Sequence, residues 1–189
     1  MARLIVSEFV SLNGIMEAPG GEPTHPHSGW TFESTYGEDH YGYKLEEAEE
    51  AGSLLLGRHT YEGFSAAWPQ REGPFADKLN SMPKYVVSST LADPEWENTT
   101  VLAGDPVAAV RELKGTAAGP ILLNGSAQLA HALTEADLVD EFRAMVHPVL
   151  VADGLRMFPD PAALQKLKLA QAIAYDSGVA LLIYERAEG

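Results

Sequence analysis

The chain alternates short apolar runs with segments of helical periodicity over its first two thirds. Residues 54–56 are three consecutive leucines, a pattern typical of a strand buried on both faces of a parallel sheet. After residue 138 the pattern changes to two-residue alternation, in which Phe142, Ala144 and Val146 share one face. The chain therefore predicts strands and helices in alternation up to residue 133 and strands alone afterwards.

These patterns give a list of expected elements. Strands are expected at residues 3–11, 54–56, 84–88, 99–102, 120–123 and 142–146, with a terminal hairpin of residues 167–175 and 179–185. Helices are expected at residues 38–51, directly after Gly57, at 75–80, at 106–113 with Gly115 as the helix end, and at 127–133. This order predicts an α/β sandwich with a mostly parallel central sheet and a C-terminal antiparallel hairpin, and the length fits a single domain over residues 1–189.

Residues 15–37 show no apolar periodicity and are expected to form a loop of some 20 residues. Loops of this length inside a compact domain are usually functional or disordered. The loop carries the aromatic residues Trp30, Phe32 and Tyr36, which we expect to pack over a site.

Two stretches combine a buried strand, a glycine and a helix start. In the first, Gly57 ends a strand, and the helix that follows would present the amides of His59, Thr60 and Tyr61 beside the Arg58 guanidinium. The partial positive charge of a helix N-terminus favours a phosphate there. An ordinary strand-to-helix connection with a surface arginine is the alternative.

The second stretch repeats this design after the strand at residues 120–123. Gly125 follows Asn124, and Ser126 is expected to cap a helix that begins at Ala127. Two helix N-termini can thus face one pyrophosphate from neighbouring strands.

The residues of the first stretch also carry a family resemblance. Gly57-Arg58-His59-Thr60-Tyr61-Glu62, followed by Ser88-Ser89 at a later strand end, resembles dihydrofolate reductase. Asp140-Glu141-Phe142-Arg143 with His147-Pro148-Val149 resembles the branch related to the reductase domain of the bacterial riboflavin-synthesis enzyme. The resemblance runs in pieces from about residue 4 to residue 184. It implies a dihydrofolate reductase-like three-layer sandwich, NADPH as cofactor with NADH as the alternative, and a homodimer.

The resemblance also implies where the cofactor lies. The cofactor-binding residues would be Asn13, Gly14, Ile15, Gly57, Arg58, His59, Thr60, Ser88, Ser89, Asn124, Gly125, Ser126, Ala127 and Gln128. Asn13 stands where this branch often has an acid and serves equally well as a cap of its own turn. The family usually has Gly-Gly, joined by a cis peptide, where this chain has Asn124-Gly125, so cis and trans both stay open. Ala127 stands where some dihydrofolate reductases have a basic residue, which leaves the NADPH preference to Arg58.

Two residues are candidates for catalysis. Counting back from Gly57, Tyr41 falls near the acid with which dihydrofolate reductase protonates its pterin, while Glu38 and Asp39 lie one turn earlier. A tyrosine is protonated at neutral pH and can donate a proton directly, whereas Asp39 or Glu38 would need a raised pKa. Tyr41 is therefore the first candidate and Asp39 the second. A core aromatic is the alternative for Tyr41, and His147 is interpreted as structural.

Charge and composition exclude several partners. With 13 basic and 27 acidic residues the net charge is −14, which repels nucleic acid and anionic membranes. No apolar run reaches the ~20 residues of a membrane span, and no leader pattern is present, so a soluble cytoplasmic protein is expected. There is no cysteine, and His25 and His27 have no third ligand nearby, so no metal site is expected.

Two functions remain. The first is an NAD(P)H-dependent reductase that transfers hydride to a small heterocyclic or carbonyl substrate, such as a pterin or a ribosylaminopyrimidine. The second is a non-catalytic dinucleotide-binding or sensor protein, which Asn13 and Tyr41 favour because each stands where relatives carry an acid.

Overall fold

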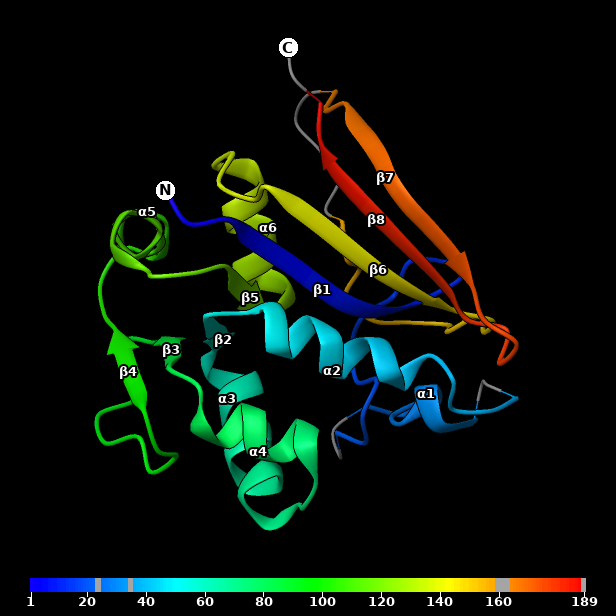
Figure 1. The fold of residues 1–189 in the computed structure, drawn as a ribbon, viewed down its shortest axis with the longest axis horizontal. Coiled ribbons are helices and arrows are strands. Elements are labelled where there is room, and N and C mark those ends of the chain that lie inside the picture. The colour runs from blue at the N-terminus through cyan, green and yellow to red at the C-terminus, as the bar shows by residue number, and fades with distance from the viewer. Residues whose placement is uncertain (23–24, 34–35, 159–163, 188–189) are drawn as a thin grey trace.

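One eight-stranded sheet runs through the protein (Figure 1). The structure is a computed structural model, and it describes residues 1–22, 25–33, 36–158 and 164–187. The strand order is β4-β3-β2-β5-β1-β6-β8-β7. The six strands from β4 to β6 are parallel, and β8 and β7 complete the sheet antiparallel. The predicted fold class is confirmed.

The strands lie where the apolar pattern predicts them, to within a few residues. Their bounds are β1 (Leu4–Ser11), β2 (Ser53–Gly57), β3 (Lys84–Val87), β4 (Thr99–Leu102), β5 (Ile121–Leu123), β6 (Glu141–His147), β7 (Leu167–Ala174) and β8 (Ala180–Arg186). The central strands β2 and β5 are buried at every position, as strands covered on both faces must be.

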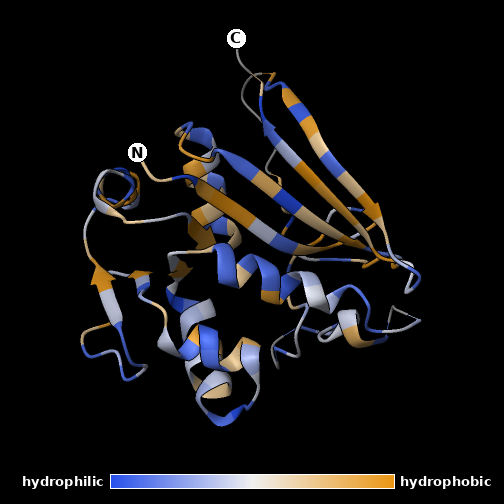
Figure 2. Ribbon diagram, in the orientation of Figure 1, coloured by the Kyte–Doolittle hydropathy of each residue, from blue (hydrophilic) through white to orange (hydrophobic). Residues whose placement is uncertain are grey.

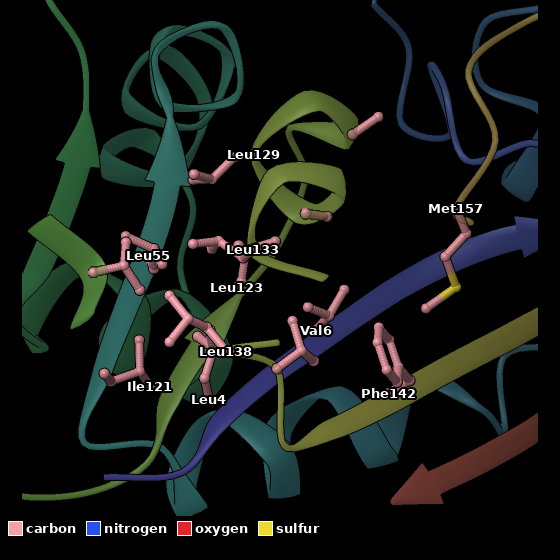
Figure 3. Packing of buried hydrophobic residues seen from close by; sticks show 14 of the residues in the cluster. Leu4, Val6, Leu55, Ile121, Leu123, Leu129, Leu133, Leu138, Phe142 and Met157 are labelled. Carbon is pink, nitrogen blue, oxygen red and sulfur yellow. The ribbon is translucent and has the colours of Figure 1, made fainter. Parts of the chain in front are cut away.

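The helices cover both faces of the sheet and make three layers. They are α1 (Trp30–Glu33), α2 (Tyr41–Glu50), α3 (Arg58–Ala67), α4 (Pro74–Ser81), α5 (Pro106–Thr116) and α6 (Ala127–Glu135), with the short 3-10 turn η1 (Trp68–Gln70). One core cluster joins the sheet to α5 and α6, where Leu55 and Leu123 lie around Leu133 (Figure 3). A second cluster joins the opposite face to α2, α3 and α4. The hydrophobic colour concentrates on the strands, and α2 is largely hydrophilic (Figure 2).

Several helix boundaries differ from prediction by one to three residues. The helix expected from residue 38 begins at Tyr41, because the Asp39 carboxylate accepts hydrogen bonds from the amides of Asp176 and Ser177 in the β7–β8 turn. Asp39 is thereby fixed to the hairpin, outside the helix. The helix expected to end at Gly115 continues through it to Thr116.

The loop at residues 15–37 is only partly the aromatic cover that the sequence predicts. Trp30 is buried, and its indole N–H donates to the Glu17 carbonyl at 2.9 Å. Phe32 is 65% exposed and Tyr36 is 90% exposed, so the expectation that they pack over a site is wrong for these two. Trp30 alone of the three reaches the core cluster with Ile15 and Val151.

Candidate functional site

The two strand-glycine-helix turns lie side by side at one edge of the sheet. Strand β2 pairs with β5, so the turn after Gly57 meets the turn after Leu123. The Thr60 and Ser126 hydroxyl oxygens are 3.3 Å apart. A Cβ on Gly57 would lie 1.9 Å from the Ser126 hydroxyl oxygen, and one on Gly125 would lie 2.5 Å from the Thr60 methyl carbon. The two turns therefore interlock, and each requires its glycine.

Both helices that follow these turns begin without a side-chain cap. Gly57 has no side chain to offer, and the Ser126 side chain makes no capping bond, which corrects the predicted role of Ser126. The Ser126 backbone is left-handed (φ 65°), and the Ser126 hydroxyl lies against the Thr60 hydroxyl rather than against the first amides of α6. By contrast, Asp105 caps α5 through the Ala108 amide at 2.7 Å. The first amides of α3 and α6 are thus free of a cap from their own N-cap side chains.

The other residues predicted for the second turn differ in their exposure and their contacts. Ala127 is buried in the core beneath α6, and Gln128 is exposed on the first turn of the helix. Asn124 donates from its side-chain amide to the Ser7 carbonyl at 2.8 Å, which ties the turn to β1. The Asn124–Gly125 peptide bond is trans.

A buried carboxylate occupies the second turn. Glu8 of β1 accepts from the Gly125 amide with both oxygens, at 2.9 and 3.1 Å. Burial raises its pKa to about 8, against smaller opposing effects of the Lys44 ammonium and the Gly125 amide. The sequence analysis did not select Glu8, although an acid inside an otherwise apolar central strand was the signal available.

The first turn carries its own basic side chain. Arg58 is partly exposed, and its guanidinium donates to the Glu62 carboxylate at 2.6 Å and lies 3.2 Å from His59 Nε2. Strand β3 pairs with β2 through Gly57 and Val87, so Ser88 and Ser89 follow at the same edge of the sheet.

The two serines have different surroundings. The Ser88 hydroxyl accepts from the Thr90 and Leu91 amides at 3.2 and 3.0 Å, as serines that end strands often do. Ser89 is exposed. Ser89 therefore offers the more accessible hydroxyl.

Asn13, Gly14 and Ile15 lie at the end of β1 and are tied to the segment after β6. The Asn13 side chain donates to the Val151 carbonyl at 2.8 Å and accepts from its amide at 3.1 Å. Gly14 has φ 90°, and its carbonyl accepts from the Met157 amide. Ile15 is buried in the cluster of Trp30 and Val151. The Asn13 side chain thus fastens its turn to a segment 138 residues later in the chain.

An aromatic cluster fills the space between β1, β6 and the start of α2. The ring centroids of His40 and Tyr41 are 4.1 Å apart, and those of His147 and Phe9 are 5.4 Å apart. Trp30 contacts His147 edge-on at 5.5 Å. Burial raises the pKa of Tyr41, whose hydroxyl bonds Thr31, and lowers the pKa of His147 to about 4. At neutral pH this cluster is therefore uncharged, with a protonated phenol at its edge.

The pKa of Asp39 is lowered, whereas a carboxyl group that donates a proton at neutral pH needs a raised pKa. The Ser177 hydroxyl, with the amides of Asp176 and Ser177, lowers the pKa of Asp39 despite some desolvation. The carboxyl is therefore ionised at neutral pH, contrary to the raised pKa that the donor role would require. Within the described part of the chain, no three histidine or acidic side chains converge as a metal site.

Comparisons with known proteins bear on this geometry. The model of the RibD C-terminal domain matches residues 2–181. The chain belongs to the RibD C-terminal domain family. Two Bacillus subtilis (strain 168) proteins are similar in sequence. The uncharacterized protein YyaP is 28% identical over 96% of this chain and 94% of YyaP, and the uncharacterized protein YwjB is 27% identical over 77% of this chain and 79% of YwjB.

Several solved structures share the fold of this chain. A putative riboflavin biosynthesis protein from Shewanella sp. PV-4 superposes with a TM-score of 0.75, 18% identity and full coverage of both chains. Dihydrofolate reductase of Enterococcus faecalis, complexed with NADP(H), gives 0.65 and 16% identity over 98% of this chain and 97% of that one. Acinetobacter baumannii RibD gives 0.67 and 17% identity over 99% of this chain and 58% of that one. The RibD C-terminal domain family and the dihydrofolate reductase-like fold are thus shown together. In the described ranges of the chain, no helix is long and apolar enough to cross a membrane.

Proposed function

We propose that the protein is an NADPH-dependent reductase that transfers hydride to a small heterocyclic or carbonyl substrate. The observation that supports this proposal most strongly is the pair of helices α3 and α6, which begin side by side. Neither helix is capped by its N-cap side chain, and Arg58 lies in the first turn of α3. Uncapped amides and an arginine suit the pyrophosphate and the 2′-phosphate of a dinucleotide. Membership of a family whose neighbours are reductases supports the same assignment.

The roles of the residues follow from their places. The residues that would surround the phosphates are Gly57, His59, Thr60, Asn124, Gly125, Ser126, Ala127 and Gln128. Arg58, Ser88 and Ser89 would lie on the adenosine side. Asn13, Gly14 and Ile15 at the end of β1 would flank the nicotinamide. The bound cofactor would supply the hydride, and the uncharged aromatic cluster around Tyr41 would hold an apolar ring and exclude water.

The proposal is tested by titrating Arg58→Ala with NADPH and NADH in a calorimeter. Losing a charge-assisted contact of about 1.5–3 kcal/mol should weaken NADPH binding by roughly ten- to a hundredfold. NADH has no 2′-phosphate and should lose much less. Arg111→Ala, an exposed arginine on α5, is the matched control and should change neither affinity. Equal losses for the two cofactors would remove Arg58 from the 2′-phosphate.

A dinucleotide-binding protein without catalysis is the second candidate. The observation that favours it is the ionised Asp39, which removes one of the two carboxyl groups considered as proton donors before α2. Both candidates require cofactor binding. They differ in whether any substrate oxidises the bound NADPH.

A further inference from the structure

The Glu8 carboxylate occupies an amide that the proposed cofactor would need. Gly125 lies immediately before α6, and its N–H donates to both Glu8 oxygens, at 2.9 and 3.1 Å. The Glu8 side chain leaves β1 on the face that carries α6, and the residue is only 7% exposed. A carboxyl group of the protein itself thus binds the turn in which a dinucleotide phosphate is expected.

No nearby cation neutralises this carboxylate. Among the described residues, no lysine or arginine lies within ion-pair distance of Glu8. Lys44 and Glu47 of α2 act on it from across β1 with opposite signs, and they are paired with each other at 2.6 Å. On its own face, the register neighbour on β6 is Ala144, and the turn contributes no charged side chain. Ionised Glu8 is therefore stabilised only by the Lys44 charge across β1, which Glu47 opposes, and by the Gly125 amide.

Two anions cannot share this amide without strong repulsion, because the site is buried and poorly screened. We propose that Glu8 gates the dinucleotide site: its carboxyl group holds the Gly125 amide in the empty protein, and a cofactor phosphate enters only while Glu8 carries a proton, so that ionised Glu8 closes the site. This inference rests on the proposed function, since it concerns the same cofactor site.

NADPH affinity should fall as the pH rises above the pKa of Glu8. Below pH 8 most Glu8 side chains already carry a proton, and NADPH binding requires no uptake. Above pH 8 the empty site is ionised, so NADPH affinity should fall about tenfold per pH unit. At pH 8 roughly half a proton should be taken up per cofactor bound.

The experiment is calorimetric titration with NADPH from pH 6 to pH 9, repeated at pH 8 in buffers of different ionisation enthalpy to count protons. Repeating it with NADH separates the response of Glu8 from titration of the 2′-phosphate. Glu8→Gln keeps an acceptor for the Gly125 amide and should abolish both the proton uptake and the loss of affinity above pH 8. Glu112→Gln, which removes an exposed acid of α5, should keep both.

The outcomes separate the two proposals. NADPH binding without proton uptake in the natural protein would overturn the gate and leave the cofactor assignment standing, whether or not Glu8→Gln folds. An unchanged pH profile in folded Glu8→Gln would also overturn it. Absence of NADPH binding at every pH, in the natural protein and in Glu8→Gln, would reject the proposed function itself.

Discussion

Tyr41 combines two properties that a proton donor requires. It begins α2 at the edge of the aromatic cluster, with Phe9 at 6.3 Å and His40 at 4.1 Å between ring centroids. Burial raises its pKa, so the phenol keeps its proton throughout the neutral range. Hydride transfer to a C=N or C=O group creates negative charge that must be protonated, and Tyr41 is the residue that we propose for this step.

Replacing Tyr41 by phenylalanine should therefore lower kcat by roughly a hundredfold or more, the usual contribution of general acid catalysis. The measurement begins with a screen of pterins, flavin precursors, quinones and carbonyl compounds for NADPH oxidation. Any substrate found is then compared in the natural protein and Tyr41→Phe, with deuterated cofactor to show that hydride transfer limits the rate.

Tyr43 provides the matched control, because it is half-buried on the same helix and faces Arg143, with 5.8 Å between its ring and the guanidinium. Tyr43→Phe should leave kcat unchanged. An unchanged kcat in Tyr41→Phe, with an isotope effect present, would exclude Tyr41 as the donor. If no compound were reduced at all, the binding-protein candidate would be favoured.

At the scale of single residues, the sequence predicts which residues lie at a turn better than it predicts their hydrogen-bond partners and their burial. The glycines and Thr60 could be selected because strand-to-helix turns have few solutions. The environment of Asp39 could not be foreseen, because its hydrogen-bond partners lie 137 and 138 residues away in the chain. Glu8 has the same explanation, because the Gly125 amide that it binds lies 117 residues later.

At the scale of elements, the two turns act as one unit. The Ser126 hydroxyl lies against Gly57, and Thr60 lies against Gly125, so each helix start fixes the position of the other. Gly125 also has φ 72°, which an L side chain rarely adopts. Gly57 has φ −83°, which any residue tolerates, so only its contact with Ser126 forbids a side chain there.

The contact between Gly57 and Ser126 can be tested by substitution. Gly57→Ala should reduce the free energy of unfolding by about 1–3 kcal/mol, the usual cost of overpacking, because the new methyl group would overlap Ser126. Urea denaturation monitored by circular dichroism measures the change. Ser126→Gly removes the overlapping atoms and should recover most of the stability in the double variant.

Gly63→Ala is the control, since a Cβ at this position of α3 meets no atom within 4 Å. It should be neutral or slightly stabilising, because alanine favours helix. A loss in Gly57→Ala that Ser126→Gly fails to restore would show that the two turns are not in contact.

The sequence also predicts which helices and strands form better than it predicts the residues at which they begin and end. Periodicity placed all eight strands, and most directly the buried central ones, because buried strands need apolar residues whatever their neighbours are. It placed the start of α2 three residues early, since tertiary hydrogen bonds hold Asp39 outside the helix. It also ended α5 at Gly115, although a glycine with no steric demand can remain within a helix.

At the scale of the whole molecule, strand β7 has a neighbour on one side only. Most of its residues are exposed, and Leu169 is 48% exposed. The β7–β8 hairpin lies at one end of the sheet, and hydrophobic positions recur along β7 (Figures 1 and 2). A long apolar edge strand is a template for association.

We therefore predict a homodimer formed through this hairpin. Light scattering at micromolar concentration should give about 41 kDa, twice the chain mass of 20.4 kDa. Leu169→Asp should shift the species to a monomer, because a carboxylate would be desolvated in the interface. Leu150→Asp alters a leucine that is 73% exposed elsewhere and should leave the dimer intact. A natural protein that stays near 20 kDa would contradict the prediction.

Strand β1 has a consequence for how the chain is made. It lies between β5 and β6, so the partners of Leu4 to Ser11 begin at Ile121 and Glu141. At ~5–20 residues per second, a ribosome needs roughly 6–23 s to add the residues that separate β1 from β5. The apolar first strand has no sheet neighbour during that time. Productive folding must therefore wait for most of the chain to be synthesised, and a nascent chain that stalls before residue 121 would present this strand to chaperones or to aggregation.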